Sequence, residues 1–276
     1  MDLIVNQKFE GKRLEELLNF YHVSKATIYK IHVDKLLLVN GKPVRNDYIL
    51  KESDVLTFSL NEIEPNIIIP HKGDIKILYE DDDILIVNKP AYLLVHSDGI
   101  TLDTLANRVA SYAIKSGYEG TIKHVHRIDY ETSGMVIFAK HFLAHSYLGS
   151  LFESRNITKT YVCLCHHKFK DLDGVIDAKI GKDRHDNKQR ISKTGKEALS
   201  KYHVLKNDLI SRVQIEIIGG RKHQIRVHLA SINHPIVGDK LYGKGEERRL
   251  LLHFKKVNFI HPRTLKPFEF TCNEDF

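Results

Sequence analysis

The stretch that decides the fold is HRIDYETSG, residues 126–134, which stands directly before the apolar run MVIFA, residues 135–139. A short apolar run that follows polar residues and a glycine predicts a buried strand. Loops at strand ends are where rigid scaffolds present reactive side chains. Gly134 allows a tight backbone path, and Thr132 and Ser133 can satisfy turn amides. The residues alone leave two interpretations open, a polar turn with an Arg–Asp pair and a loop that carries chemistry.

Outward from this loop, the chain from residue 74 onward predicts strands that follow one another through turns, with few helices between them. We expect strands at 84–88, 134–139, 158–165, 175–180, 198–205 and 211–218, and helices at 102–115, 141–153 and 222–232. Strands joined mainly by turns are typical of an antiparallel sheet. The sequence therefore predicts an α+β domain, a mostly antiparallel mixed sheet with flanking helices.

The first sixty residues predict a separate small α/β unit. Two helices are indicated, the second capped by Ser24, followed by a strand at 36–39, an Asn40-Gly41 turn and a strand at 54–60. The next residues, 61–73, contain two prolines and a glycine without a helical period, which is typical of a linker. We therefore divide the chain into a small unit at 1–62, a linker at 63–73 and a larger domain at 74–276.

Composition narrows the class of protein. The 276 residues carry 42 lysines and arginines against 35 aspartates and glutamates, a net charge of +7, which favours an anionic partner and nucleic acid first. Three cysteines are too few, and odd in number, for a disulfide scaffold, so we expect a reducing cytoplasmic compartment. No apolar run approaches a membrane span, and the N-terminus lacks a signal-peptide pattern. We expect neither a membrane protein nor a secreted mini-protein.

The common site motifs give no metal or nucleotide site. The sequence lacks a phosphate-binding loop, a dinucleotide fingerprint, a zinc-protease helix and a serine elbow. The run Cys163-x-Cys165-His166-His167 lacks the second separated ligand pair of a structural zinc site, so core cysteines are the expectation. The acidic run Asp81–Asp83 is interpreted as a solvated turn rather than a cation site. We expect no metal.

Four motifs in a fixed order favour the interpretation of residues 126–134 as a loop that carries chemistry over that of a plain polar turn. HRIDYETSG resembles the H-R-[LI]-D-x-x-[TS]-S-G signature of RluA-type pseudouridine synthases, and three further segments match that family in order: NKP at 88–90 with Val95-His96, KTYV at 159–162, and GRKHQIRVHL at 220–229 with HPIVGD at 234–239. The closing residues LH at 252–253 and HPRT at 261–264 also fit. The resemblance spans about 75–265 and implies an enzyme that isomerises uridine to pseudouridine in RNA without a cofactor. Tyr92 and Phe254 depart from the family pattern, where glycine and a small residue are usual.

The N-terminal unit resembles an S4 RNA-binding domain. Its Arg13-Leu14, Ser24-Lys25, Val39-Asn40-Gly41-Lys42 and Asp54 carry that resemblance, although Val33-Asp34-Lys35 replaces the usual glycine-bearing turn. An S4-like unit beside an RluA-type domain implies large-subunit ribosomal RNA as the partner, with tRNA as an alternative. We expect a cytoplasmic monomer that does not bind membranes.

The resemblance also implies roles for individual residues. Asp129 is the essential carboxylate, which must be ionised to attack the sugar or to assist loss of the base. Arg226 is its expected cationic partner, because a guanidinium can hold a carboxylate with two hydrogen bonds. Tyr161 is expected to stack on the target uracil and to help remove its C5 proton. A phosphate-binding arginine and a core tyrosine remain the alternatives for these two residues.

Further residues are expected to contact RNA. Arg127 would occupy the space left by the extruded nucleotide, with a plain phosphate contact as the alternative. The segment 181–201 holds seven basic and three acidic residues, a net charge of +4, and is interpreted as a mobile phosphate-gripping loop, or else a solvated hairpin. The other expected RNA contacts are His126, Lys89, Arg221, His223, Gln224, Arg13, Lys25, Lys182, Arg184, Lys188 and Arg190.

Two other classes of function stay open at this point. A non-catalytic RNA-binding or ribosome assembly factor would share the basic surface, and a nucleoside or phosphoester hydrolase would share a reactive carboxylate. The combination of Asp129, Tyr161 and Arg226 favours the isomerase, because a binding protein would be free to lose any of them.

Overall fold

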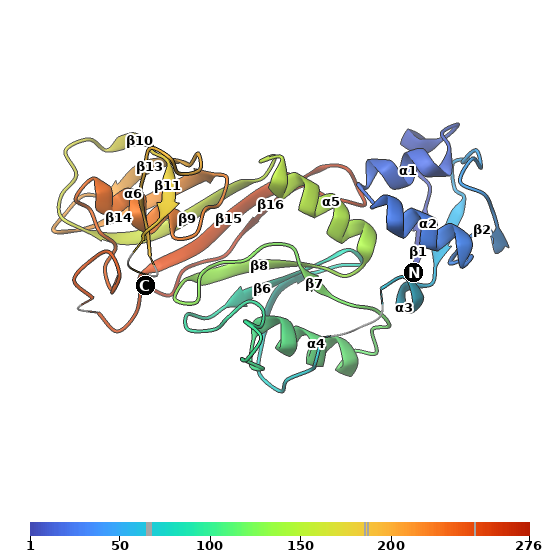
Figure 1. Cartoon of the computed structure of the whole chain (residues 1–276), viewed down its shortest axis with the longest axis horizontal. Helices are drawn as coiled ribbons and strands as arrows, with labels where there is room; N and C mark the ends of the chain where they lie inside the picture. Colours follow the sequence, from blue (N-terminus) through green and yellow to red (C-terminus); the bar gives the residue numbers. More distant parts are fainter. Residues whose placement is uncertain (65–67, 185, 187, 246) are drawn as a thin grey trace.

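The computed structural model describes residues 1–64, 68–184, 186, 188–245 and 247–276. The N-terminal unit lies at one end of an elongated molecule, and a long sheet extends from it toward the other end (Figure 1). No helix among the described residues has the length and apolar character required to cross a membrane.

The N-terminal unit combines a four-stranded antiparallel sheet with short helices. Its elements are β1 (Asp2–Ile4), η1 (Gln7–Phe9), α1 (Leu14–Phe20), α2 (Lys25–Val33), β2 (Leu37–Val39), β3 (Lys42–Pro43), β4 (Val55–Phe58) and α3 (Leu60–Ile63). The strand order is β1-β4-β2-β3. Ser24 caps α2 as expected, since its hydroxyl accepts a hydrogen bond from the Thr27 amide at 3.1 Å. Asn40 and Gly41 both have positive φ, the geometry of a tight hairpin turn.

One large sheet forms the rest of the fold. Its strands are β5 (Lys76–Glu80), β6 (Ile84–Lys89), β7 (Lys123–His124), β8 (Ser133–Ala139), β9 (Thr158–His166), β10 (Asp173–Asp177), β13 (Leu199–Lys206), β14 (Ile210–Ile218), β15 (Leu252–Ile260) and β16 (Pro267–Thr271). They run in the order β10-β13-β14-β9-β15-β8-β6-β5, with β16 beside β15 and β7 beside β8. Among these described strands the pairing of β8 with β15 is parallel and the other pairings are antiparallel. The predicted α+β fold is confirmed.

Three helices accompany this sheet, α4 (Leu105–Lys115), α5 (Phe142–Glu153) and α6 (Gln224–Ser231). Thr104 and His141 cap α4 and α5 with side chains that accept backbone amide hydrogens. Helix α5 packs on β8, whereas α6 packs on β13. Because β8, β9 and α6 reach the same region, residues distant in sequence can share one site there.

The structure contains four strands that the sequence did not predict, β5, β7, β15 and β16, and it differs from the predictions in further segments. Residues 60–63 form the short helix α3, where the end of a strand and the start of a linker were expected. The basic segment 181–201 follows the alternative given for it, since it contains a two-stranded hairpin of β11 (Ile180–Lys182) and β12 (Gln189–Ile191) rather than an irregular mobile loop. Ladder hydrogen bonds between the two arms organise this hairpin, which a count of charges does not reveal. Residues 65–67 of the expected linker lie outside the described residues.

The N-terminal unit packs on the larger domain through aromatic side chains. The rings of Phe20 and Tyr21 lie 5.7 and 5.8 Å from that of Tyr147 on α5. The ring of Phe58 makes an edge contact with Phe142 at 5.3 Å. The Tyr21 hydroxyl donates a buried hydrogen bond to the carbonyl of Pro262 at 3.0 Å. One hydrophobic core therefore runs through both parts of the chain.

The acidic run near β6 is not the solvated turn that the sequence suggested. Asp83 is buried, and its carboxylate accepts hydrogen bonds from His141 at 2.9 Å and from Arg263 at 2.5 Å. Asp81 accepts one from His261 at 2.9 Å. Asp81, Asp83 and His261 are close enough to hold a metal ion, but these hydrogen bonds account for their arrangement without one. The thiols of Cys163 and Cys165 lie 3.5 Å apart and are buried and free, as expected of core cysteines.

Candidate active site

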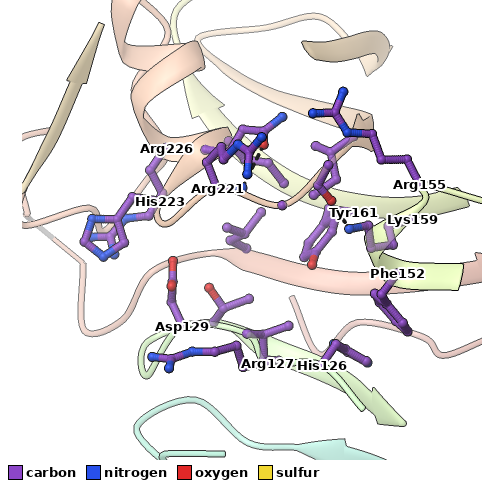
Figure 2. A pocket seen from close by; sticks show the side chains of 18 of the residues that line it. His126, Arg127, Asp129, Phe152, Arg155, Lys159, Tyr161, Arg221, His223 and Arg226 are labelled. Atoms are coloured by element: carbon purple, nitrogen blue, oxygen red, sulfur yellow. Dashed lines mark hydrogen bonds between the residues drawn. The ribbon is translucent and has the colours of Figure 1, made fainter. Parts of the chain in front are cut away.

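A pocket of about 480 Å³ opens between β8, β9 and the start of α6. Its walls come from the loop at 125–132, the end of α5, strand β9, and the turn at 217–226. Asp129, Tyr161, Arg226, Arg127, Arg221 and His223 all line it (Figure 2). The structure thus brings together residues from three of the four sequence motifs.

Gly134 allows this arrangement. The parallel pairing sets Gly134 of β8 opposite Phe254 of β15, which in turn pairs with Tyr161 of β9. Gly134 has φ +116°, and a Cβ on it would lie 2.5 Å from the backbone nitrogen and oxygen of Phe254. Because only glycine permits that approach, the loop that carries Asp129 is held close to the strand that carries Tyr161.

Tyr161 is almost fully buried and also lines the pocket, so the two interpretations of its role are not exclusive. Its ring stacks on Phe254 at 4.6 Å, with the ring planes 12° apart. Burial, with a smaller contribution from the charge of Asp129, raises the pKa of the Tyr161 hydroxyl well above its usual value. Phe254, the departure from the family pattern, thus supports the tyrosine from behind.

Arg226 does not make its bidentate contact with Asp129, which corrects the expectation. Its Nε and Nη2 each donate to a carboxylate oxygen of Asp239 at 2.8 Å, and its Nη1 lies 2.7 Å from Glu131. Burial acts to lower the pKa of Arg226, but Asp239, then Glu131, then Asp129 hold it well above its usual value. The guanidinium stays charged beside Asp129, while a different aspartate fixes its position.

Sequence reasoning assigned no role to Asp239 or Glu131. Glu131 lies two residues after Asp129 inside the HRIDYETSG signature, and Asp239 ends the HPIVGD segment. A buried arginine needs a carboxylate, so an acid within each motif was the available signal. The pairing itself depends on how α6 sits against the turn at residue 239.

Lys89 was expected to contact RNA, and the structure contradicts this. Its side chain is fully buried, and its ammonium donates to the carbonyls of Pro90, Leu93 and Tyr130 at 2.9, 2.8 and 3.2 Å. Burial lowers the pKa of Lys89 to about 7, although the charge of Asp129 opposes the shift. Lys89 therefore ties the loop that carries Asp129 to the chain that follows β6. In that same chain Tyr92 has φ +63°, which explains why glycine suits its position.

His126 and Gln224 also differ from the expected RNA contacts. The Nε2 of His126 accepts a hydrogen bond from the Ile137 amide at 3.1 Å, and its ring stacks on Phe152. Burial, helped by the charge of Lys159, lowers the pKa of His126 to about 3, so the ring is neutral. Gln224 is buried and bonds to the Arg221 amide and the Leu199 carbonyl. Both side chains shape the pocket from within the protein.

Arg127 and His223 keep positions suited to a ligand. Arg127 is exposed at the pocket, with its Nη1 3.3 Å from Nε2 of His96. His223 caps α6 with φ +57°, and its Nδ1 lies 2.9 Å from the hydroxyl of Tyr242. Burial lowers the pKa of His223, with Asp129 opposing, so a neutral ring faces the site.

The remaining expected RNA contacts lie on the surface. Arg13 and Lys25 are exposed on the N-terminal unit, far along the molecule from α6 (Figure 1). On the hairpin, Lys182 and Arg184 are exposed, whereas Lys188 pairs with Asp186 and Arg190 with Asp183. Arg221 donates from Nε to the carbonyl of Glu197 at 3.0 Å. Their contact with RNA remains a prediction.

Phe152, Arg155 and Lys159 are among the pocket residues to which the sequence assigned no role. Lys159 belongs to the KTYV segment, so a motif signal existed for it. Phe152 and Arg155 lie at and just after the end of α5 and belong to no motif.

Comparison with known proteins identifies the family of this chain. Residues 83–231 match the family described as RNA pseudouridylate synthase, and residues 1–56 match the N-terminal domain of the RluD ribosomal pseudouridine synthase. The chain is 38% identical to the uncharacterized RNA pseudouridine synthase YhcT of Bacillus subtilis, over 96% of this chain and 90% of that one. It is 32% identical to the ribosomal large subunit pseudouridine synthase C of Buchnera aphidicola subsp. Baizongia pistaciae, over 99% and 94%.

A solved structure supports the fold. Human RNA pseudouridylate synthase domain containing 1 superposes with a TM-score of 0.63 at 24% identity, over 75% of this chain and 87% of that one. Together with the sequence matches over nearly the whole length, this places the chain in the RNA pseudouridine synthase family.

Proposed function

We propose that this chain converts uridine to pseudouridine in large-subunit ribosomal RNA, with Asp129 as the catalytic carboxylate. The observation that carries the proposal is the meeting of Asp129, Tyr161 and the charged guanidinium of Arg226 in one pocket. The RNA class rests on the relative named ribosomal large subunit pseudouridine synthase C, which aligns over 99% of the chain.

The reaction needs no external reagent. The bond between C1′ of the ribose and N1 of uracil breaks, the base rotates, and a bond from C1′ to C5 forms. The C5 hydrogen is lost as a proton, and N1 gains a proton, so atoms and electrons balance. Asp129 either attacks C1′ or stabilises the positive charge that develops there when the base leaves. Arg226 supplies a positive charge near the carboxylate in either role.

Tyr161 is suited to the later proton transfer. While Asp129 is charged, burial and that charge hold the tyrosine hydroxyl protonated. If Asp129 becomes neutral by bonding to the sugar, one of the two causes disappears, and the hydroxyl gives up its own proton more easily. That proton can go to N1, which gains one in the reaction, while the tyrosine oxygen takes the proton from C5. Because Phe254 stacks on the tyrosine ring, its orientation toward a uracil in the pocket is fixed in advance.

The exposed cations have the proposed task of holding RNA. Arg127 would fill the space of the extruded uridine, since a planar cation can stack there. Arg13 and Lys25 would bind RNA at the far end, and Lys182 and Arg184 near α6. We also propose that the enzyme acts as a monomer. We place the enzyme in the cytoplasm, where ribosomal RNA is modified and thiols such as those of this chain stay reduced.

The test is tritium release from unmodified large-subunit ribosomal RNA labelled at C5 of uridine. Asp129→Asn should lower the rate by at least about 1000-fold while RNA binding persists, because the fold and basic surface remain. Asp171→Asn, a change of an exposed aspartate outside the pocket, serves as the matched control. Near-normal turnover of Asp129→Asn would refute the catalytic assignment.

A second arm tests the RNA class and the alternatives. Pseudouridines are mapped in ribosomal RNA and tRNA from a strain that lacks the gene, and a loss confined to tRNA would refute the substrate assignment. Binding of RNA without tritium release by the unaltered protein would favour a non-catalytic binding factor. Free uracil or strand cleavage among the products would indicate a hydrolase.

A further inference from the structure

The pocket extends past the residues that surround Asp129. In Figure 2 the ring of Tyr161 lies between Asp129 on one side and Lys159, Arg155 and Phe152 on the other. The mechanism above uses the first side and leaves the second without a task. This second part, lined by Phe152, Arg155, Lys159, Gly219 and Gly220, is called the remote end below.

Lys159 is the unusual residue of the remote end. Lys159 is 8% exposed, and its ammonium donates a hydrogen bond to the carbonyl of Gly219. The ammonium also lies 5.5 Å from the centre of the Phe152 ring. Among the described residues no carboxylate forms an ion pair with it, and burial alone lowers its pKa to about 8. A buried cation without a counter-ion is costly, so an anion brought beside it is bound with a large gain.

The backbone leaves room for such an anion. Gly219 and Gly220 have φ of +94° and +154°, and a Cβ on Gly220 would lie 3.1 Å from the Lys159 ammonium. A side chain there would crowd the nitrogen, whereas glycine keeps one side of it open. Arg155 holds the left-handed φ of +63°, and its Nε lies 4.0 Å from where a Cβ of Gly219 would be. Two cations therefore approach the same pair of glycines.

The charge at the remote end is positive overall. Lys159 and Arg155 contribute two positive charges, Glu153 contributes one negative charge, and Arg221 on the facing turn adds a further positive charge to the pocket. The neutral His126 ring and Phe152 form the wall below, so the site offers cations beside a flat aromatic surface. Basic groups next to an aromatic ring are what a nucleotide backbone with its base requires.

We propose that the remote end is a subsite for one phosphodiester of the substrate RNA, next to the target uridine, with Lys159 as its buried ligand. This inference rests on the proposed function, since the uridine enters between Asp129 and Tyr161. The phosphate bonds to Lys159 and Arg155, and Arg221 adds attraction from the facing turn. Contact with a phosphate beside the reacting nucleotide would fix which nucleotide of the strand stands over Asp129.

The first experiment compares Lys159→Met with Lys206→Met, a loss of the same charge at an exposed position on β13. Unmodified large-subunit ribosomal RNA labelled at C5 is the probe. We expect Lys159→Met to raise KM by about 10-fold or more with kcat within about 3-fold, because the phosphate is bound alike in the ground and transition states. The slope of log affinity against log salt should fall by about 0.7 to 0.9, the share of one phosphate. Lys206→Met should change neither KM nor the slope against salt.

Failure of the two proposals is distinguishable. If the unaltered protein is inactive, the proposed function is refuted. If it is active but Lys159→Met and Lys206→Met have the same KM and the same salt slope, only the subsite is refuted. A fall in kcat with KM unchanged would mean that Lys159 acts on the chemistry, which also overturns the subsite.

A second experiment does not depend on the folding of a variant. Once the modified uridine is mapped, short RNAs carry a neutral methylphosphonate on its 5′ or its 3′ linkage. One of these two linkages should raise KM of the unaltered protein by about 10-fold, and the same linkage should have no further effect on Lys159→Met. If neither linkage matters to the unaltered protein, no phosphate binds at the remote end and the proposal is wrong.

Discussion

The replacement Asp239→Asn tests how Arg226 is held. Asp239 is fully buried, Arg226 is 1% exposed, and two hydrogen bonds of 2.8 Å join them. The other oxygen contacts of Asp239 are the amides of Leu241 and Tyr242 at 2.9 and 3.0 Å, which an asparagine oxygen can still accept. The new amide nitrogen then faces the Arg226 Nε, a donor against a donor.

The magnitude follows from these contacts. Removing one partner of a buried ion pair costs about 3–5 kcal/mol. Glu131 still contacts Arg226 at 2.7 Å and is partly exposed, so the lower end, about 3 kcal/mol, is expected. For a chain of this size that corresponds to a fall in Tm of about 6–12 °C. A guanidinium displaced by about 1 Å should also cost about 100-fold in kcat.

Calorimetric unfolding and tritium release measure the two effects. Glu131→Gln is the matched control, because it neutralises the more exposed acid of the same arginine, and it should cost about 1 kcal/mol. If Asp239→Asn unfolds within about 1 kcal/mol of the unaltered protein, or no more easily than Glu131→Gln, Asp239 is not what fixes Arg226.

Two further predictions concern stability. Burial lowers the pKa of Lys89 from 10.5 to about 7 against the opposing charge of Asp129, so between these values the unfolded chain binds more protons and the free energy of unfolding rises with pH. Lys89→Met should remove this rise. If urea unfolding shows the same change in the free energy of unfolding between about pH 7 and about pH 9.5 in the variant and in the unaltered protein, the reasoning is wrong. Tyr21→Phe leaves the buried Pro262 carbonyl without its donor and should destabilise the whole chain by about 1 kcal/mol in a single calorimetric transition. A separate transition of the N-terminal unit alone would show that the two parts unfold independently.

Much of the fold was readable from local patterns. The strands at 134–139 and 158–165 and the helix at 141–153 lie within one residue of the observed β8, β9 and α5. These elements have strong apolar runs or clear caps, which act over a few residues. Strands β5, β7, β15 and β16 and the helix α3 were missed, and α3 has no apolar period that would predict it. The β11–β12 hairpin was only the alternative to a mobile loop, because it depends on pairing between two weakly apolar arms.

The sequence by itself determined which residues are proposed to carry the chemistry, since the motifs name Asp129, Tyr161 and Arg226, and all three line one pocket. Tertiary structure decided their partners. Arg226 is paired with Asp239, Lys89 lies beneath the loop with its side-chain nitrogen on three carbonyls, and Lys159 lines the pocket without an ion pair to any acid among the described residues. The reason is physical: residue type sets what a side chain can bind, but sheet register and helix packing set which groups are within reach and whether water remains beside them.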